Sequence, residues 1–102
     1  MEDSLQTFVK DLFYSDFLEA LKTFVRIESL SPLYDLEWKT NRNLFKQSDH
    51  LVSFLHSQGL KGVTVHQLKD EGRSPFLIVK VEPFNYESQT EKTVLFYGHL
   101  DK

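Results

Sequence analysis

The chain has no cysteine among its 102 residues. This absence excludes a disulfide framework and any metal site built on thiolates. A metal ion would therefore have to be held by imidazole and carboxylate groups. A basic block is also missing, and the net charge is −3, from 12 Lys and Arg against 15 Asp and Glu. The charge balance therefore gives no reason to expect a nucleic-acid partner.

Long apolar runs are missing as well. No run approaches the roughly 20 residues that a membrane-spanning helix needs. The N-terminal segment Met1–Gln6 is acidic and lacks the basic and apolar regions of a secretory signal. We therefore expect no membrane partner and a cytoplasmic location. A hydrophobic content of 40% is ordinary for a globular chain, and the length suits one small domain or a piece of a larger one.

The segment from about Ser4 to Ile27 has the apolar spacing of an amphipathic helix. Its stripe consists of Leu5, Phe8, Val9, Leu12 and Phe13, then Phe17, Leu18, Leu21, Phe24 and Val25. Ser15-Asp16 is a plausible N-cap or break. The pattern therefore predicts either two short helices or one bent helix. We interpret the stripe as core packed against a sheet, not as a cofactor site.

A further helix is predicted over about Thr40–Gln58. Gly59 is well placed to end it in the left-handed conformation. Ser48 lies in its apolar stripe, where close packing would need a small residue. His50 and His56 lie six positions apart and do not share a face, so we interpret them as solvated residues and not as a metal pair.

After this helix the period changes to alternation. Residues 63–67 predict a strand that is half open to solvent, with His66 on its polar face. A turn is predicted at Asp70–Pro75 and a mostly buried strand at Phe76–Val81. The apolar run Val94–Tyr97 predicts a third, buried strand.

The element order is therefore helix, helix, strand, strand, strand, which predicts an α/β fold. We expect residues 1–102 to form one unit, with no internal repeat and no second domain. A fully apolar strand needs cover on both faces, and two helical regions would hardly supply it. We therefore expect the chain to be the opening part of a larger α/β domain.

The residues that follow the third predicted strand are Gly98, His99, Leu100 and Asp101. Chemistry in open α/β sheets sits just past the carboxyl ends of strands. Alternation along an extended chain would place His99 and Asp101 on one side. A metal-binding His is often held in this way, with the metal on one ring nitrogen and a carboxylate on the other. Taken alone the motif is weak, and a solvated His and Asp at a strand end is the plain alternative.

Four stretches together resemble the N-terminal region of a known family. They are Phe24–Ser31, Leu55–Leu60, Gly72–Val79 and Val94–Asp101. The family is that of the dinuclear-zinc metallopeptidases, which includes glutamate carboxypeptidase, carnosine dipeptidase, acetylornithine deacetylase, succinyl-diaminopimelate desuccinylase and aminoacylase. The last stretch is the most specific, because it is similar to the family's first metal-binding motif.

The resemblance implies a zinc-peptidase catalytic domain, of which this chain would supply the N-terminal helices and the first three strands of a mixed sheet. It implies that His99 is a zinc ligand and that Asp101 is the catalytic-site carboxylate that hydrogen-bonds and tunes it. The implied reaction is hydrolysis of an amide bond in a dipeptide, a peptide end or an N-acyl amino acid. Two metal ions, zinc or else cobalt or manganese, would activate a bridging water.

The family's other ligands and its Glu general base follow the first motif, and nothing in this sequence matches them. Glu82, Glu87 and Glu91 are not in matching positions. Because catalytic zinc has about three protein ligands, we expect the 102-residue chain to be inactive by itself. A homodimer is left open for the complete enzyme.

Two other hypotheses stay open. One is a truncated, non-catalytic homologue that acts through partner binding, with its exposed terminal strand added to another sheet edge. The other is an unrelated small α+β binding domain in which His99 and Asp101 meet by chance.

Overall fold

One long helical segment begins the chain in the computed structural model, which describes residues 2–84 and 92–102. It consists of α1 (Glu2–Leu12), a π-helical turn η1 (Phe13–Phe17) and α2 (Leu18–Arg26). Leu12 and Leu18, which flank the turn, both have right-handed helical backbone, so the helix is continuous. Of the two predicted arrangements the structure therefore has a single helix, and Ser15-Asp16 lies inside the π turn and caps nothing. Because such a turn holds one extra residue, it rotates the apolar stripe of α1 relative to that of α2.

The helix predicted over Thr40–Gln58 is two helices, α3 (Trp38–Asn41) and α4 (Asn43–Ser57). Arg42 separates them with a left-handed backbone at φ 64°. The N–H of Asn43 then donates to Oδ1 of Asn41 at 2.9 Å, which satisfies a free donor at the start of α4. Gly59 follows α4 with φ 60°, as predicted.

The two predicted strands form an antiparallel hairpin of β1 (Val63–Asp70) and β2 (Arg73–Val81). The predicted turn at Asp70–Pro75 is too long, since β2 begins at Arg73. Gly72 N–H donates to Oδ1 of Asp70 at 3.0 Å, so the Asp side chain helps to close this tight turn. Burial alternates over the first part of β1 and His66 is exposed, which confirms the prediction for that strand.

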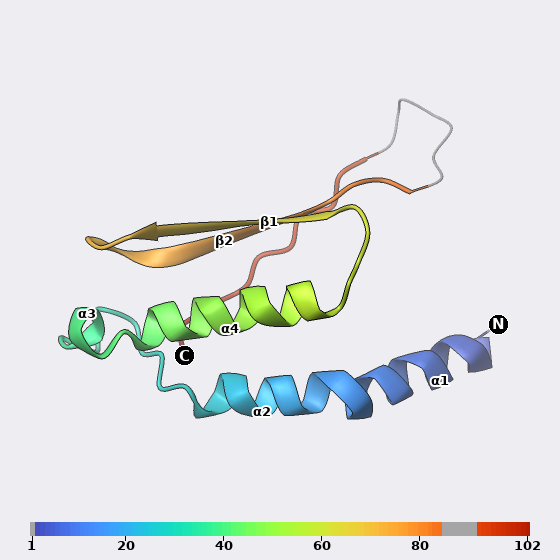
Figure 1. Ribbon diagram of the computed structural model, residues 1–102, viewed down its shortest axis with the longest axis horizontal. Helices are drawn as coiled ribbons and strands as arrows, with labels where there is room; N and C mark the ends of the chain where they lie inside the picture. Colours follow the sequence, from blue (N-terminus) through green and yellow to red (C-terminus); the bar gives the residue numbers. More distant parts are fainter. Residues whose placement is uncertain (1, 85–91) are drawn as a thin grey trace.

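Helix α4 occupies the centre of the arrangement, with the hairpin on one side and α2 on the other (Figure 1). Leu44 and Phe45, both on α4, are the buried hydrophobic residues of the described chain. Ser48 is fully buried in the apolar stripe of α4, and its Oγ accepts from Nε2 of Gln67 at 2.9 Å. The mixed α and β class is therefore confirmed.

The predicted third strand at Val94–Tyr97 is wrong. Residues 92–99 have no regular secondary structure, and the sheet of the described chain has two strands. The side chains of Val94 to Tyr97 are 73–91% exposed. An apolar run favours burial, but a strand also needs backbone hydrogen bonds to a neighbour, and among the described residues none joins this run to the hairpin. The segment is instead attached beyond this run, where Lys102 N–H donates to the carbonyl of Ser29.

Two predictions of burial are also wrong. Leu5, Phe8 and Val9 on α1 are more than half exposed, because α1 runs past the end of α4 (Figure 1). In β2 the expected buried run is largely exposed, and Pro75 is its buried residue. Both elements have an apolar face that no described element covers.

The total exposed area also indicates that parts of the chain are uncovered. The chain exposes 8703 Å², whereas a compact monomer of its 12.0 kDa mass would expose about 6,000 Å². Many large hydrophobic side chains are among the exposed residues, and extended apolar patches mark interaction surfaces. In the part of the chain that the structure describes, no helix combines the length and the apolar character needed to cross a membrane.

Candidate functional site

His99 and Asp101 lie on one side of the C-terminal segment and are hydrogen-bonded, with 2.7 Å between Nδ1 and Oδ1. An ionised carboxylate can only accept, so Nδ1 of His99 carries the proton and donates it. In the neutral ring the lone pair then lies on Nε2. The contact therefore selects one tautomer and leaves Nε2 as the nitrogen that can bind a metal or a proton.

Tyr97 is a third member of this cluster, which the sequence analysis missed. Its hydroxyl lies 3.2 Å from Nε2 of His99, and the two rings meet edge to face at 5.4 Å. Because Nε2 of the neutral ring accepts, the Tyr97 hydroxyl donates. The signal was present in the sequence, since residues 97, 99 and 101 share a side of an extended chain.

The cluster is open to solvent on the imidazole side. The side chain of His99 is 63% exposed, while that of Asp101 is 33% exposed. Asp101 is thus the more sheltered partner, and a solute can reach Nε2 by displacing only the Tyr97 hydroxyl. A hydrogen bond this exposed contributes little to stability, so the value of the contact is in orienting the ring.

As a metal ligand, His99 fits one position of a zinc site. The donor set is of the right kind, because a neutral imidazole with its second nitrogen held by a carboxylate is a common zinc ligand. The rest of a site is missing from residues 2–84 and 92–102, where no three His, Cys, Asp or Glu side chains gather closely enough to hold an ion. The described residues therefore offer one candidate ligand and no complete catalytic centre.

The other three His residues lie apart from this cluster. His50 is half-buried and its Nε2 lies 2.8 Å from the carbonyl oxygen of Ala20, so it joins α4 to α2. The prediction that His50 is solvated is therefore wrong, because α2 packs over this part of α4. His56 and His66 are exposed as expected.

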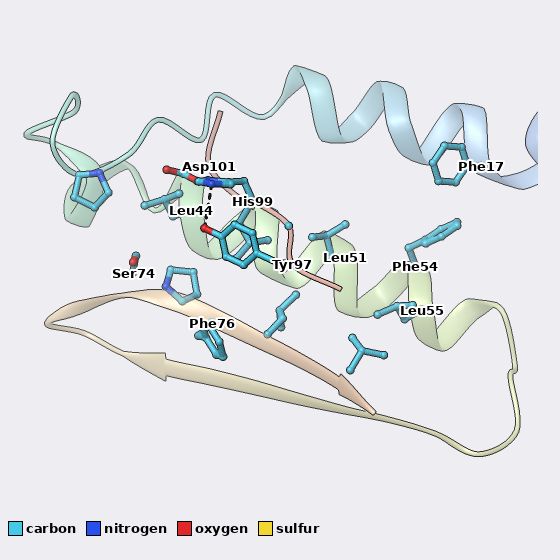
Figure 2. A pocket seen from close by; sticks show the side chains of 16 residues that line it. Phe17, Leu44, Leu51, Phe54, Leu55, Ser74, Phe76, Tyr97, His99 and Asp101 are labelled. Atoms are coloured by element: carbon cyan, nitrogen blue, oxygen red, sulfur yellow. Dashed lines mark hydrogen bonds and ion pairs between the residues drawn. The ribbon is translucent and has the colours of Figure 1, made fainter. Parts of the chain in front are cut away.

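A hollow of about 640 Å³ lies beside the pair (Figure 2). Its walls come from α4, β2 and residues 97–101, with Phe17 from the first helix. The lining is mostly apolar and includes Leu51, Phe54, Leu55, Leu77 and Val79, together with Tyr97, His99 and Asp101. An imidazole and a carboxylate thus face a space whose other walls are largely hydrocarbon.

The segment that carries the pair is tied to the end of α2. The ammonium group of Lys102 donates to the carbonyl of Val25 at 3.0 Å and also to that of Ile27. Carbonyls at a helix C-terminus lack partners within the helix and carry partial negative charge, so a cation is stabilising there. Lys102 therefore attaches the site segment to a specific end of a specific helix.

No protein-family model, curated protein or solved structure matches this chain. The roles expected for His99 and Asp101 therefore rest on the motif and on the hydrogen bond between them.

Proposed function

We propose that this chain supplies the first metal-binding motif of a metal-dependent hydrolase that cleaves amide bonds in dipeptides, peptide ends or N-acyl amino acids. His99 is a metal ligand through Nε2, and Asp101 is the catalytic-site carboxylate that orients it. Zinc is the proposed metal, and cobalt or manganese would also suit nitrogen and oxygen donors. The observation that carries the proposal is the 2.7 Å hydrogen bond between His99 Nδ1 and Asp101 Oδ1.

This hydrogen bond supports the proposal in two ways. It holds the ring in the tautomer whose free lone pair is on Nε2, and it raises the basicity of that nitrogen toward a metal. The apolar hollow beside the pair offers a water-poor neighbourhood in which charge interactions are stronger.

The remaining ligands and the general base are proposed to come from outside the described residues. The exposed area of 8703 Å² supports this, because the uncovered apolar faces of α1 and β2 are surfaces that further structure would bury. A zinc-peptidase domain with a mixed sheet, and a cytoplasmic location, belong to the same proposal. A homodimer remains open.

The first test is the intact mass of the native polypeptide. An antibody raised against residues 1–40 would capture it from source cells after fractionation, and we expect a mass several times 12.0 kDa in the cytoplasmic fraction. The captured protein should hydrolyse dipeptides or N-acyl amino acids, lose activity to a chelator and regain it with zinc. The His99→Ala protein should show no chelator-sensitive hydrolysis, and full activity in that variant would refute the proposal.

A second candidate function is non-catalytic partner binding by a short chain. The exposure of Val94 to Tyr97 favours it, since an extended apolar segment without a strand partner can add to another sheet edge. A captured mass near 12.0 kDa together with a stable protein partner would favour this candidate over the hydrolase.

A further inference from the structure

Ser29 contacts the residues on both sides of Asp101. Its carbonyl oxygen accepts from Lys102 N–H at 2.9 Å, and its hydroxyl donates to the carbonyl of Leu100 at 3.2 Å. The two contacts fix the peptide groups that precede and follow Asp101. Ser29 therefore brackets the residue whose carboxylate holds the imidazole of His99.

The Ser29 hydroxyl supplies a hydrogen-bond donor where a backbone N–H usually does. The N–H of Ser29 turns back to the carbonyl of Ile27 at 2.9 Å, so it is not available to Leu100. In a ladder between extended segments a backbone N–H would pair with that carbonyl, whereas here the side chain supplies the donor. An alanine at this position would leave the Leu100 carbonyl without this partner.

Gln47 on α4 sets the direction of that hydroxyl. Its Nε2 lies 2.9 Å from the Phe24 carbonyl and 3.2 Å from Oγ of Ser29. The opposite amide orientation would place Oε1 against the Phe24 carbonyl, acceptor against acceptor. The Ser29 hydroxyl therefore accepts from Gln47 and points its own proton toward Leu100.

Burial makes this arrangement rigid. Ser29 and Gln47 are both 0% exposed, so no bulk water competes for their hydrogen bonds. A buried polar group that loses its partner costs about 1–3 kcal/mol, which disfavours other rotamers. The hydrogen bonds run from Gln47 on α4 through Ser29, which follows α2, to Leu100. Leu100 lies 71 positions after Ser29 in the sequence.

We propose that Ser29, oriented by Gln47, is a positioning residue for the His99–Asp101 pair. By fixing the backbone on both sides of Asp101, it places the carboxylate where it accepts from Nδ1 of His99. The metal-binding consequence of this placement rests on the function proposed above, whereas the placement itself does not.

Because of Lys102, the orientation of Asp101 can be tested separately from the attachment of the C-terminal segment to α2. Its ammonium group holds the segment to the carbonyls at the end of α2 without using the Ser29 side chain. A variant that loses only the hydroxyl should therefore keep the segment near α2 while freeing the peptide before Asp101. We therefore expect the His99–Asp101 hydrogen bond to become less well ordered, while the C-terminal segment stays beside α2.

The test is nitrogen NMR of the His99 ring in the full chain labelled with ¹⁵N-histidine. In the wild type we expect the proton on Nδ1, and in Ser29→Ala a mixture in which the Nε2–H form gains. Ser29→Thr keeps the hydroxyl and should restore the wild-type signature. Ser31→Ala is the matched control, since the Ser31 hydroxyl accepts from Leu33 N–H at 3.3 Å in the same loop.

Two outcomes would overturn the proposal. One is a His99 tautomer in Ser29→Ala that equals the wild type. The other is loss of the folded state in both Ser29→Ala and the near-isosteric Ser29→Cys, seen in the amide spectra, because Ser29 would then hold the fold and not the pair. Gln47→Met, which removes the amide donor at similar volume, should shift the tautomer in the same direction as Ser29→Ala.

Zinc titration of the same samples separates this proposal from the hydrolase. Substitution of the groups that orient a metal-binding His typically costs 10–100-fold in affinity, so we expect Ser29→Ala to weaken zinc binding at His99 by about tenfold. A tautomer change without any zinc effect on the His99 signal would keep Ser29 as a positioning residue and reject a consequence of that placement for metal binding. Equal zinc affinity in both proteins, with an unchanged tautomer, would keep the metal role and reject the positioning role.

Discussion

The junction of α2, α4 and the C-terminal segment contrasts with the extended run before it. In the junction, the polar side chains of Ser29 and Gln47 are completely buried. In the run, Leu95 and Phe96 are 91% and 89% exposed. The usual placement of polar and apolar groups is thus reversed between the two regions. This reversal shows that directional hydrogen bonds fix the junction, whereas the apolar run is not packed against any described surface.

The largest effect should come from truncating a buried apolar residue of α4. Leu44→Ala is expected to lower the free energy of unfolding by about 2–5 kcal/mol, because it removes methyl groups from a buried position. Leu95→Ala, the same change in the exposed run, should cost less than about 0.5 kcal/mol. Urea unfolding followed by the fluorescence of Trp38, whose ring stacks on Phe45 at 6.3 Å, measures both. Equal losses would erase the contrast between the regions.

A polar substitution in the junction should have the next largest effect. Gln47→Leu removes the donor to Phe24 and to Ser29, and it should cost about 1–3 kcal/mol of unfolding free energy because buried acceptors lose their partner. Gln6→Leu on the exposed α1 is the control and should be nearly neutral. A stabilising result for Gln47→Leu would mean that packing, not hydrogen bonding, decides this region.

In the exposed run, the Tyr97 hydroxyl should affect ligand binding more than stability. Tyr97→Phe removes a donor that competes for the lone pair on Nε2 of His99, so zinc affinity at His99 should rise about two- to fivefold. Histidine NMR during zinc titration measures this, with the exposed Tyr34→Phe as the matched control. Weaker binding in Tyr97→Phe would show that the hydroxyl helps to hold the ion.

The smallest effect concerns a carboxylate on the exposed side of α4. A hydrogen bond from Lys69 lowers the pKa of Asp49, and one from Gln67 acts in the same direction. Since the folded-state pKa lies below the unfolded one, this stabilisation is present above the usual Asp pKa of 3.8 and is lost as pH falls through the lower folded value. Asp49→Asn should therefore lower stability at pH 7 by at most about 0.5 kcal/mol and make little difference near pH 2. Urea midpoints at the two pH values test this, and Lys69→Met should reproduce the loss.

The sequence indicated more of the secondary structure than of the tertiary structure. Apolar spacing located the first helix and α4, alternation identified β1 and the exposure of His66, and Gly59 marked a helix end. The break at Arg42 was missed, because an arginine does not signal a left-handed backbone. The π turn was missed because the apolar spacing on either side of it suits an uninterrupted helix equally well.

In the candidate site, too, the local contacts could be predicted from the sequence and the long-range contacts could not. His99 and Asp101 could be paired from the sequence, because a spacing of two residues in extended chain is a local property. Ser29 and Gln47 could not be found, since their contacts join segments that are far apart in sequence and a lone Ser or Gln is more often a surface residue. The half-buried state of His50 was missed for the same reason, as it depends on where α2 lies.

By itself the sequence determined the helical and extended segments, the exclusion of thiolate chemistry, and the side on which His99 and Asp101 meet. These follow from the periods of the backbone and from residue chemistry, which act over a few neighbouring residues. The tertiary structure alone decided that Val94 to Tyr97 form no strand and that buried polar groups hold the segment after them. Pairing and burial depend on which distant surfaces are available, and that is a property of the whole arrangement.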